Sequence, residues 1–295
     1  MELRVLQYFL TIAREESISK AAEFLHITQP TLSRQIKELE EELGKQLFVR
    51  GNRKITLTDE GMLLRNRAEE IIDLVDKTEA EIISSEMIIS GDVYIGGGET
   101  EGMRLLAKVI SDIQAQYPHI QFHLYSGNSQ DVTDRLDKGL IDFGVLIEPA
   151  NISKYDFIKL PTTDTWGLLM RKDNALASID KITPDIIKNR PLICSNQEMV
   201  RNEISGWLGK DFNTLNIVAT YNLIYNAALL VEENVGYALT LDKLVNTECN
   251  SHLCFRPLEP KLEVGLTIVW KRYQVFSKAS QLFIEELQKK FSSVG

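Results

Sequence analysis

Two short amphipathic helices joined by a tight turn constrain this sequence more than any other feature. Ser17 is a good N-cap for the first helix. Residues 26–27 form the turn, and Thr28 then caps a second helix that has Pro30 in its first turn, where a missing N–H costs nothing. Gly44 ends this helix, because glycine readily adopts the left-handed conformation after a helix. The pattern predicts a helix-turn-helix.

The flanking residues extend this motif into a winged domain. Apolar residues at helical spacing predict a further helix over residues 4–14. Two strand-like runs, 47–50 and 54–57, flank the hairpin signal Gly51-Asn52. We therefore expect a DNA-binding domain over residues 1–58.

A long helix follows, capped by Thr58 and with acidic residues in its first turn. Its apolar residues alternate in steps of four and three, which is typical of a coiled-coil seam. We expect this linker, residues 59–89, to pair with a second copy, although the seam could instead pack on its own C-terminal domain. The predicted dimerisation residues are Leu64, Ala68, Ile71, Val75 and Ile82.

Strands and helices alternate in the remaining residues, 90–295. The first run comprises strands 93–95, 121–125 and 141–147 and helices 103–117 and 130–138. A similar run follows, and the chain closes with a strand at 265–270 and a helix at 277–291. This order predicts parallel sheets with helices on both faces, so the fold class is α+β multidomain.

Residues 17–61 resemble the DNA-binding signature of LysR-type transcriptional regulators, and looser similarity continues to the end of the chain. The matching positions include Ala21, Ala22, Gln29, Pro30, Leu39, Glu40, Gly44, Leu57, Thr58 and Gly61. The resemblance implies a C-terminal effector domain of the periplasmic-binding-protein type 2 fold. Its two subdomains are expected at about 90–160 with 266–295, and at about 161–265, joined by two crossover segments. It also implies homodimers, which commonly associate as tetramers, and RNA polymerase as a partner.

A net charge of −9 opposes DNA binding at long range, so contact must come from a local surface. The second helix of the motif is expected in the major groove, with Gln29 facing adenine, Arg34 facing guanine and Lys37 facing phosphate. The alternative is a merely solvated helix face. The predicted DNA-binding residues are Thr28, Gln29, Pro30, Thr31, Ser33, Arg34, Lys37, Arg50 and Arg53. A two-fold dimer predicts a pseudo-palindromic operator on double-stranded DNA.

A small-molecule effector is expected beyond the carboxyl ends of the strands, between the two subdomains. The residues in these loops could equally be ordinary helix caps. Glu99 and Glu101 would repel an anion, so either they point outward or the effector is neutral or cationic. The predicted effector-binding residues are Gly98, Thr100, Asn128, Ser129, Ser195 and Asn222.

Several other functions are not supported by the sequence. No nucleophile–base arrangement, P-loop or GxGxxG motif is present, so we expect neither an enzyme nor a cofactor. The three cysteines form no CxxC pair, which argues against a metal site and leaves a redox role for Cys194 as a minor alternative. No signal peptide or spanning segment is evident, so a cytoplasmic location is expected. The rival interpretation is a solute-binding or enzymatic α/β protein whose N-terminal helices serve assembly.

Overall fold

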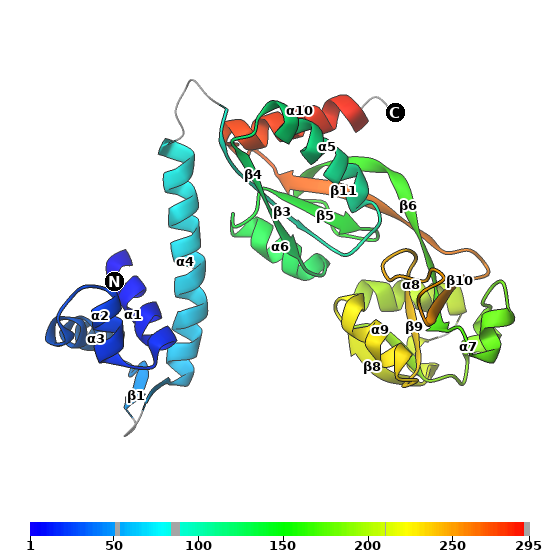
Figure 1. The fold of residues 1–295 in the computed structure, drawn as a ribbon, viewed down its shortest axis with the longest axis horizontal. Coiled ribbons are helices and arrows are strands. Elements are labelled where there is room, and N and C mark those ends of the chain that lie inside the picture. Colours follow the sequence, from blue (N-terminus) through cyan, green and yellow to red (C-terminus); the bar gives the residue numbers. More distant parts are fainter. Residues whose placement is uncertain (51–53, 84–88, 210, 292–295) are drawn as a thin grey trace. The chain divides into compact units, whose positions relative to one another are not determined.

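The computed structural model describes residues 1–50, 54–83, 89–209 and 211–291. The chain divides into two compact units, Met1–Ile83 and Ser84–Gly295. Figure 1 shows the helices and strands of each unit. The predicted hairpin turn Gly51-Asn52 lies outside the described residues.

The first unit is a winged helix-turn-helix, as the sequence predicted. Its elements are α1 (Leu3–Glu15), α2 (Ile18–Phe24), α3 (Gln29–Leu43), the antiparallel pair β1 (Phe48–Arg50) and β2 (Ile55–Leu57), and α4 (Asp59–Ile83). The predicted boundary residues act as expected. The side chains of Ser17 and Thr28 accept from the backbone N–H of Lys20 and Thr31, and Gly44 ends α3 with a φ of 64°. Each such cap stabilises a helix by about 1 kcal/mol.

Close backbone contacts connect the wing to α3 and α4. One oxygen of Glu40 accepts from the N–H groups of Leu47 and Phe48 at 2.7 and 3.2 Å. The Thr58 hydroxyl accepts from the N–H of Gly61 at 2.9 Å and so caps α4. A Cβ on Gly61 would lie 2.2 Å from the Leu47 carbonyl oxygen, which explains why glycine is required here.

The start of α4 packs against the core of its own domain, and this encloses one residue of the predicted dimer seam. Ala68 is fully buried, and Leu64 and Ile71 pack against the same core, which includes Leu6 and Phe9 of α1. Ala68 is therefore enclosed within one protomer, whereas Leu64 and Ile71 are only half-buried and stay predicted contacts of a partner helix. Val75 is half-buried, and the side chain of Ile82 lies outside the described residues.

One sheet runs through the second unit in the order β4-β3-β5-β11-β6-β9-β7-β8, with β10 paired to β6. Strands β3, β4 and β5 are parallel, as are β7, β8 and β9, whereas β6, β10 and β11 pair antiparallel with their neighbours. The strands are β3 (Gly91–Gly97), β4 (Ile120–Ser126), β5 (Phe143–Ile147), β6 (Tyr155–Arg171), β7 (Leu192–Ser195), β8 (Ile217–Tyr221), β9 (Tyr237–Leu241), β10 (Leu253–Pro257) and β11 (Glu263–Lys271).

Helices cover both faces of the sheet. In the first half, Val145 and Ile268 point to the core under α5 and α10, while their neighbours Leu146 and Val269 point to the core under α6. The helical elements are α5 (Met103–Gln116), α6 (Ser129–Asp137), η1 (Ala175–Ser178), α7 (Pro184–Ile187), α8 (Glu198–Leu208), η2 (Phe212–Thr214), α9 (Ile224–Glu232) and α10 (Lys278–Phe291).

Two long strands, β6 and β11, connect the two halves of this unit (Figure 1). We call the half with β3–β5, α5, α6 and α10 subdomain I, and the half with β7–β10 and α7–α9 subdomain II. The pairing of β6 with β11 shifts register between Gly265 and Leu266, which leaves Pro161 and Thr162 of β6 without partners in β11. The sequence predicted only residues 166–170 of β6 and did not predict β10, because both contain proline and charged residues that are uncommon in strands.

Candidate functional site

The N-terminal turn of α3 presents a polar, solvent-exposed face. The exposed members of the predicted DNA-binding set are Thr28, Gln29, Pro30, Thr31, Arg34 and Lys37, and Ser33 is half-buried. The face opposite carries Leu32, Ile36 and Leu39 into the core, so it fixes which residues point outward. Thr28 is engaged as the helix cap, and its hydroxyl lies 2.8 Å from that of Thr31.

Both basic residues on this face are paired with acids on the same helix. Arg34 lies 3.7 Å from Glu38, and Lys37 lies 3.3 Å from Glu41. Exposed pairs at this spacing contribute only about 0.3–0.5 kcal/mol, so phosphate or base oxygens can replace the acids. Of the two predicted wing residues, Arg53 and the side chain of Arg50 lie outside the described residues.

A cavity of about 70 Å³ lies where the two subdomains meet, at the carboxyl ends of strands from both. Subdomain I contributes the ends of β3, β4 and β5, and subdomain II contributes the ends of β7 and β8 and the start of α9. This is the place where open α/β sheets bind ligands.

Five of the six predicted effector-binding residues line this cavity, namely Gly98, Asn128, Ser129, Ser195 and Asn222. The sixth, Thr100, does not line the cavity. Its side chain is buried, its hydroxyl donates to the carboxylate of Asp164, and it accepts from the N–H of Gly102 at 3.0 Å. Burial raises the pKa of Asp164, and the hydrogen bond from Thr100 opposes this shift only in part.

The two helix N-termini at the cavity are each occupied by a side chain from the opposite subdomain. The N–H of Ile224, at the start of α9, donates to Glu99 of subdomain I at 2.8 Å. The N–H of Ser129, at the start of α6, donates to Gln197 of subdomain II at 3.3 Å. Free N–H groups at a helix start attract anions and other acceptors, so both contacts hold the subdomains together across the cavity.

The first of these contacts also settles the direction of the two acids that flank Thr100. Glu99 points into the cavity, whereas Glu101 does not line it and pairs with Arg104 in the first turn of α5. The expectation that acids near the cleft could face an effector therefore holds for Glu99 alone of the two.

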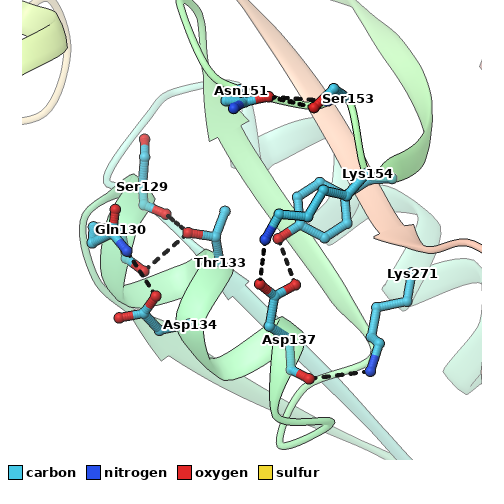
Figure 2. A network of polar contacts seen from close by, with 10 residues as sticks. Ser129, Gln130, Thr133, Asp134, Asp137, Asn151, Ser153, Lys154 and Lys271 are labelled. Carbon is cyan, nitrogen blue, oxygen red and sulfur yellow. Dashed lines mark hydrogen bonds and ion pairs between the residues drawn. The ribbon is translucent and has the colours of Figure 1, made fainter.

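Helix α6 is held firmly in subdomain I, as Figure 2 shows. At its C-terminal end, Asp137 accepts from Lys154 at 2.7 Å and from the Tyr155 hydroxyl at 2.8 Å. Near its start, the Thr133 hydroxyl donates to the Ser129 carbonyl at 2.9 Å. The capping box between Asn128 and Asp131 closes the first turn. These contacts close the first turn of α6, which carries Asn128 and Ser129, and tie its C-terminal end to the start of β6.

Sequence reasoning missed several cavity residues that do not follow directly after a strand. Gln197 hydrogen-bonds Ser195 as well as Ser129, and its position two residues past β7 was the only available signal. Trp166 lies inside β6 and Glu203 lies in the middle of α8. Neither position has a sequence pattern that distinguishes it from a core or surface residue.

The cysteines are poorly suited to a redox role. Cys194 is buried and does not line the cavity, and burial raises the pKa of its thiol to about 12. Cys254 is also buried, with a raised pKa, while Cys249 is exposed. The reactive form is the thiolate, which such a pKa suppresses. Within the described ranges, no group of three or more His, Cys, Asp or Glu residues could hold a metal ion.

Comparison with known proteins agrees with this geometry. Residues 3–62 match the family model of the bacterial regulatory helix-turn-helix protein, lysR family, and residues 89–292 match the LysR substrate binding domain. YvbU, an uncharacterized HTH-type transcriptional regulator of Bacillus subtilis, is 25% identical to this chain. The match spans 99% of this chain and 100% of YvbU. The hydrogen peroxide-inducible genes activator of Dickeya chrysanthemi is 28% identical and covers 90% of this chain and 88% of its own.

Solved structures show the same fold. Full-length CbnR in complex with its target DNA superposes with a TM-score of 0.74 at 17% identity, covering 98% of this chain and 99% of that one. A winged helix-turn-helix followed by a two-subdomain α/β unit defines the class of ligand-responsive DNA-binding regulators. This chain belongs to the LysR family of transcriptional regulators, with an N-terminal DNA-binding domain and a C-terminal effector-binding domain. No described helix is long and apolar enough to cross a membrane.

Proposed function

We propose that this chain binds a pseudo-palindromic operator as a homodimer, or as a dimer of dimers, and that a small molecule in the cavity controls this binding. The observation that best supports this proposal is the cavity. Residues of both subdomains line it, so a ligand bound there contacts both subdomains at once. An effector that prefers one arrangement of the subdomains shifts the population of assemblies on DNA.

The exposed face of α3 is the proposed reader of DNA. Gln29 and Arg34 are assigned to base edges, and Lys37 to phosphate. The N-terminal turn, with Thr28, Pro30, Thr31 and Ser33, is assigned to the DNA backbone, where helix N–H groups bind phosphate. The wing residues Arg50 and Arg53 are assigned to the flanking backbone or minor groove. CbnR, a regulator of similar fold that was crystallised with its target DNA, supports this use of the domain.

Helix α4 is the proposed dimer element, through the half-buried residues of the predicted seam and through a second face. Its described apolar side chains with high exposure are Met62, Leu63 and Leu74, at 50, 62 and 40%. Leu63 and Leu74 are eleven residues apart and so share one side of the helix, close to three full turns of about 3.6 residues each. We propose that a second copy of α4 packs on the stripe formed by Leu63 and Leu74, because two identical helices can bury such a stripe symmetrically.

The remaining assignments follow from the role in transcription. We place the domain boundaries at 1–58, 59–89 and 90–295, and the register shift at Gly265 supports the division between subdomains. RNA polymerase is the proposed protein partner, and the cytoplasm, where operator DNA is found, is the proposed location. We assign no catalytic activity.

Selection of DNA from a random duplex pool by the full chain tests the function. We expect enrichment of inverted half-sites about one helical turn apart, or a multiple of it. Arg34→Ala should relax one position in each half-site by about 1–3 kcal/mol. Arg65→Ala is the matched control, since Arg65 makes the same type of i,i+4 pair, with Glu69, on α4. Failure of the wild-type chain to enrich any sequence would refute the proposal.

A further inference from the structure

The cavity between the subdomains has an unusual set of charges for a small-molecule site. Three glutamates, Glu99, Glu148 and Glu203, line it, and no lysine, arginine or histidine is among its described lining residues. A bound carboxylate would meet these acids without a compensating cation nearby, which is unfavourable at the low dielectric of a cavity.

Two of the three glutamates already have partners in the protein. Glu99 accepts from the start of α9, at 2.8 Å from the nitrogen of Ile224. Glu148 accepts from the Thr267 hydroxyl at 3.0 Å and lies 3.6 Å from the ammonium of Lys159. Both carboxylates are therefore satisfied without a ligand.

Glu203 differs from them. Its Oε2 atom is buried and has no hydrogen-bond partner among the described residues. Burial raises the pKa of this side chain to about 7. Buried polar atoms almost always have a partner, so an orphaned one on a residue that lines a cavity is a candidate contact for a ligand. When Glu203 is ionised both of its oxygens only accept, and a cationic donor would satisfy such a carboxylate best.

An unsatisfied donor lies in the same cavity. Trp166 is only 4% exposed, and its indole N–H is buried with no acceptor in the described part of the chain. The indole N–H can only donate, so the ligand atom that completes it must be an acceptor. The ring itself offers a face over which a cation is stabilised.

We propose that the effector is a small organic amine that also carries a hydrogen-bond acceptor, with its ammonium group bound by Glu203 and its acceptor bound by the Trp166 indole N–H. This proposal rests on the proposed function, in which the cavity is the effector site.

Thermal unfolding of the full chain with matched small molecules tests this class. The probes are ethanolamine and 4-amino-1-butanol, compared with ethylene glycol and 1,4-butanediol, with glycolate and 4-hydroxybutyrate, and with propylamine and pentylamine. At ten times the dissociation constant, the amino alcohols should raise the melting temperature by about 3–6 °C. The diols and hydroxy acids should have no such effect, and the alkylamines a weaker one.

Three variants locate the effect. Glu203→Gln keeps the side-chain shape and should weaken amino alcohol binding by about 10- to 100-fold. Trp166→Phe should reduce the preference for amino alcohols over alkylamines by about 3- to 10-fold. Glu198→Gln removes an exposed acid from the same helix, α8, outside the cavity, and should leave binding unchanged. The melting temperature of each variant without ligand verifies that it folds.

The proposal is overturned if no amine raises the melting temperature, if the amine effect persists in Glu203→Gln, or if the diols or hydroxy acids stabilise as much as the amino alcohols. Stabilisation by hydroxy acids that depends on cavity residues would leave the proposed function intact and change only the ligand class. Failure of the DNA selection, by contrast, would refute the proposed function whatever the amines do.

Discussion

Single residues in the effector domain differ in how well the sequence located them. Gly98, Asn128, Ser129, Ser195 and Asn222 lie in loops that follow strands, so topology alone places them at the cavity. Thr100 also lies in such a loop, but its hydroxyl donates to Asp164, a buried acid of β6 that is distant in sequence. Trp166 and Glu203 depend on how β6 and α8 face the cavity, which a single sequence does not encode locally.

Glu203 should make the stability of the effector domain depend on pH. Its pKa in the folded chain is raised to about 7, so this carboxyl is neutral at pH 5 in the folded state and is forced to ionise while half-buried at pH 8. Stability should therefore fall as pH rises from the ordinary carboxyl pKa of 4.5 to about 7 and then level off, with a loss of about 1–2 kcal/mol after allowance for solvent screening. Glu203 also lines a second, adjoining cavity. The other acids that line these two cavities are Glu99, Glu148 and Glu263.

Urea unfolding at pH 5 and pH 8, followed by tryptophan fluorescence, measures this effect. All three tryptophans lie in the second unit, so the signal reports that unit alone. Glu203→Gln should lose less stability than wild type between the two pH values, whereas Glu198→Gln should behave as wild type. Parallel losses in wild type and Glu203→Gln would contradict the assignment.

At the scale of elements, periodicity identified α4 but not what its apolar stripe contacts. Steps of four and three suit both a coiled coil and a helix on its own domain, and burial of Ala68 assigns that residue to the latter. The hairpin, by contrast, was predictable, because a turn signal between two short runs has few alternatives. Long strand β6 was not, because its central Pro161 interrupts the pattern at the register shift.

The exposed stripe on α4 should control assembly. Replacing both Leu63 and Leu74 with glutamate should raise the dimer dissociation constant by about 100-fold or more, since each buried leucine contributes about 1.5–3 kcal/mol. Light scattering coupled to size exclusion measures the mass across a dilution series. Asp76→Lys changes a charge on another side of the same helix and should leave the dimer intact. An unchanged dimer in the double variant would rule out this face.

At the scale of the whole molecule, a net charge of −9 must be overcome by a small basic surface. The alternation of strands and helices sufficed to predict two α/β subdomains, but not the cavity, because its walls come from loops more than a hundred residues apart, such as those of Gly98 and Asn222. Packing of the two halves through β6 and β11 decides which loops meet.

Binding to operator DNA should therefore weaken steeply with salt. Lys37→Ala should reduce the slope of log K against log salt by about 0.9, the contribution of one phosphate contact, and leave the selected sequence unchanged. Fluorescence anisotropy across a salt series measures the slope. Lys278→Ala, an exposed lysine on α10 of the effector domain, is the control and should not alter it. A slope unchanged by Lys37→Ala would remove that residue from the contact set.

The contacts of Glu99 with α9 and of Gln197 with α6 have a consequence for how much effector the cell must contain. Each side chain is a tethered competitor, held at a high local concentration beside the position that a ligand would take. A ligand acceptor group that binds at either helix start must displace the side chain that occupies it, so its apparent affinity is lower than at an unoccupied helix start. We therefore expect these two residues to raise the concentration that such a ligand needs before it occupies the cavity.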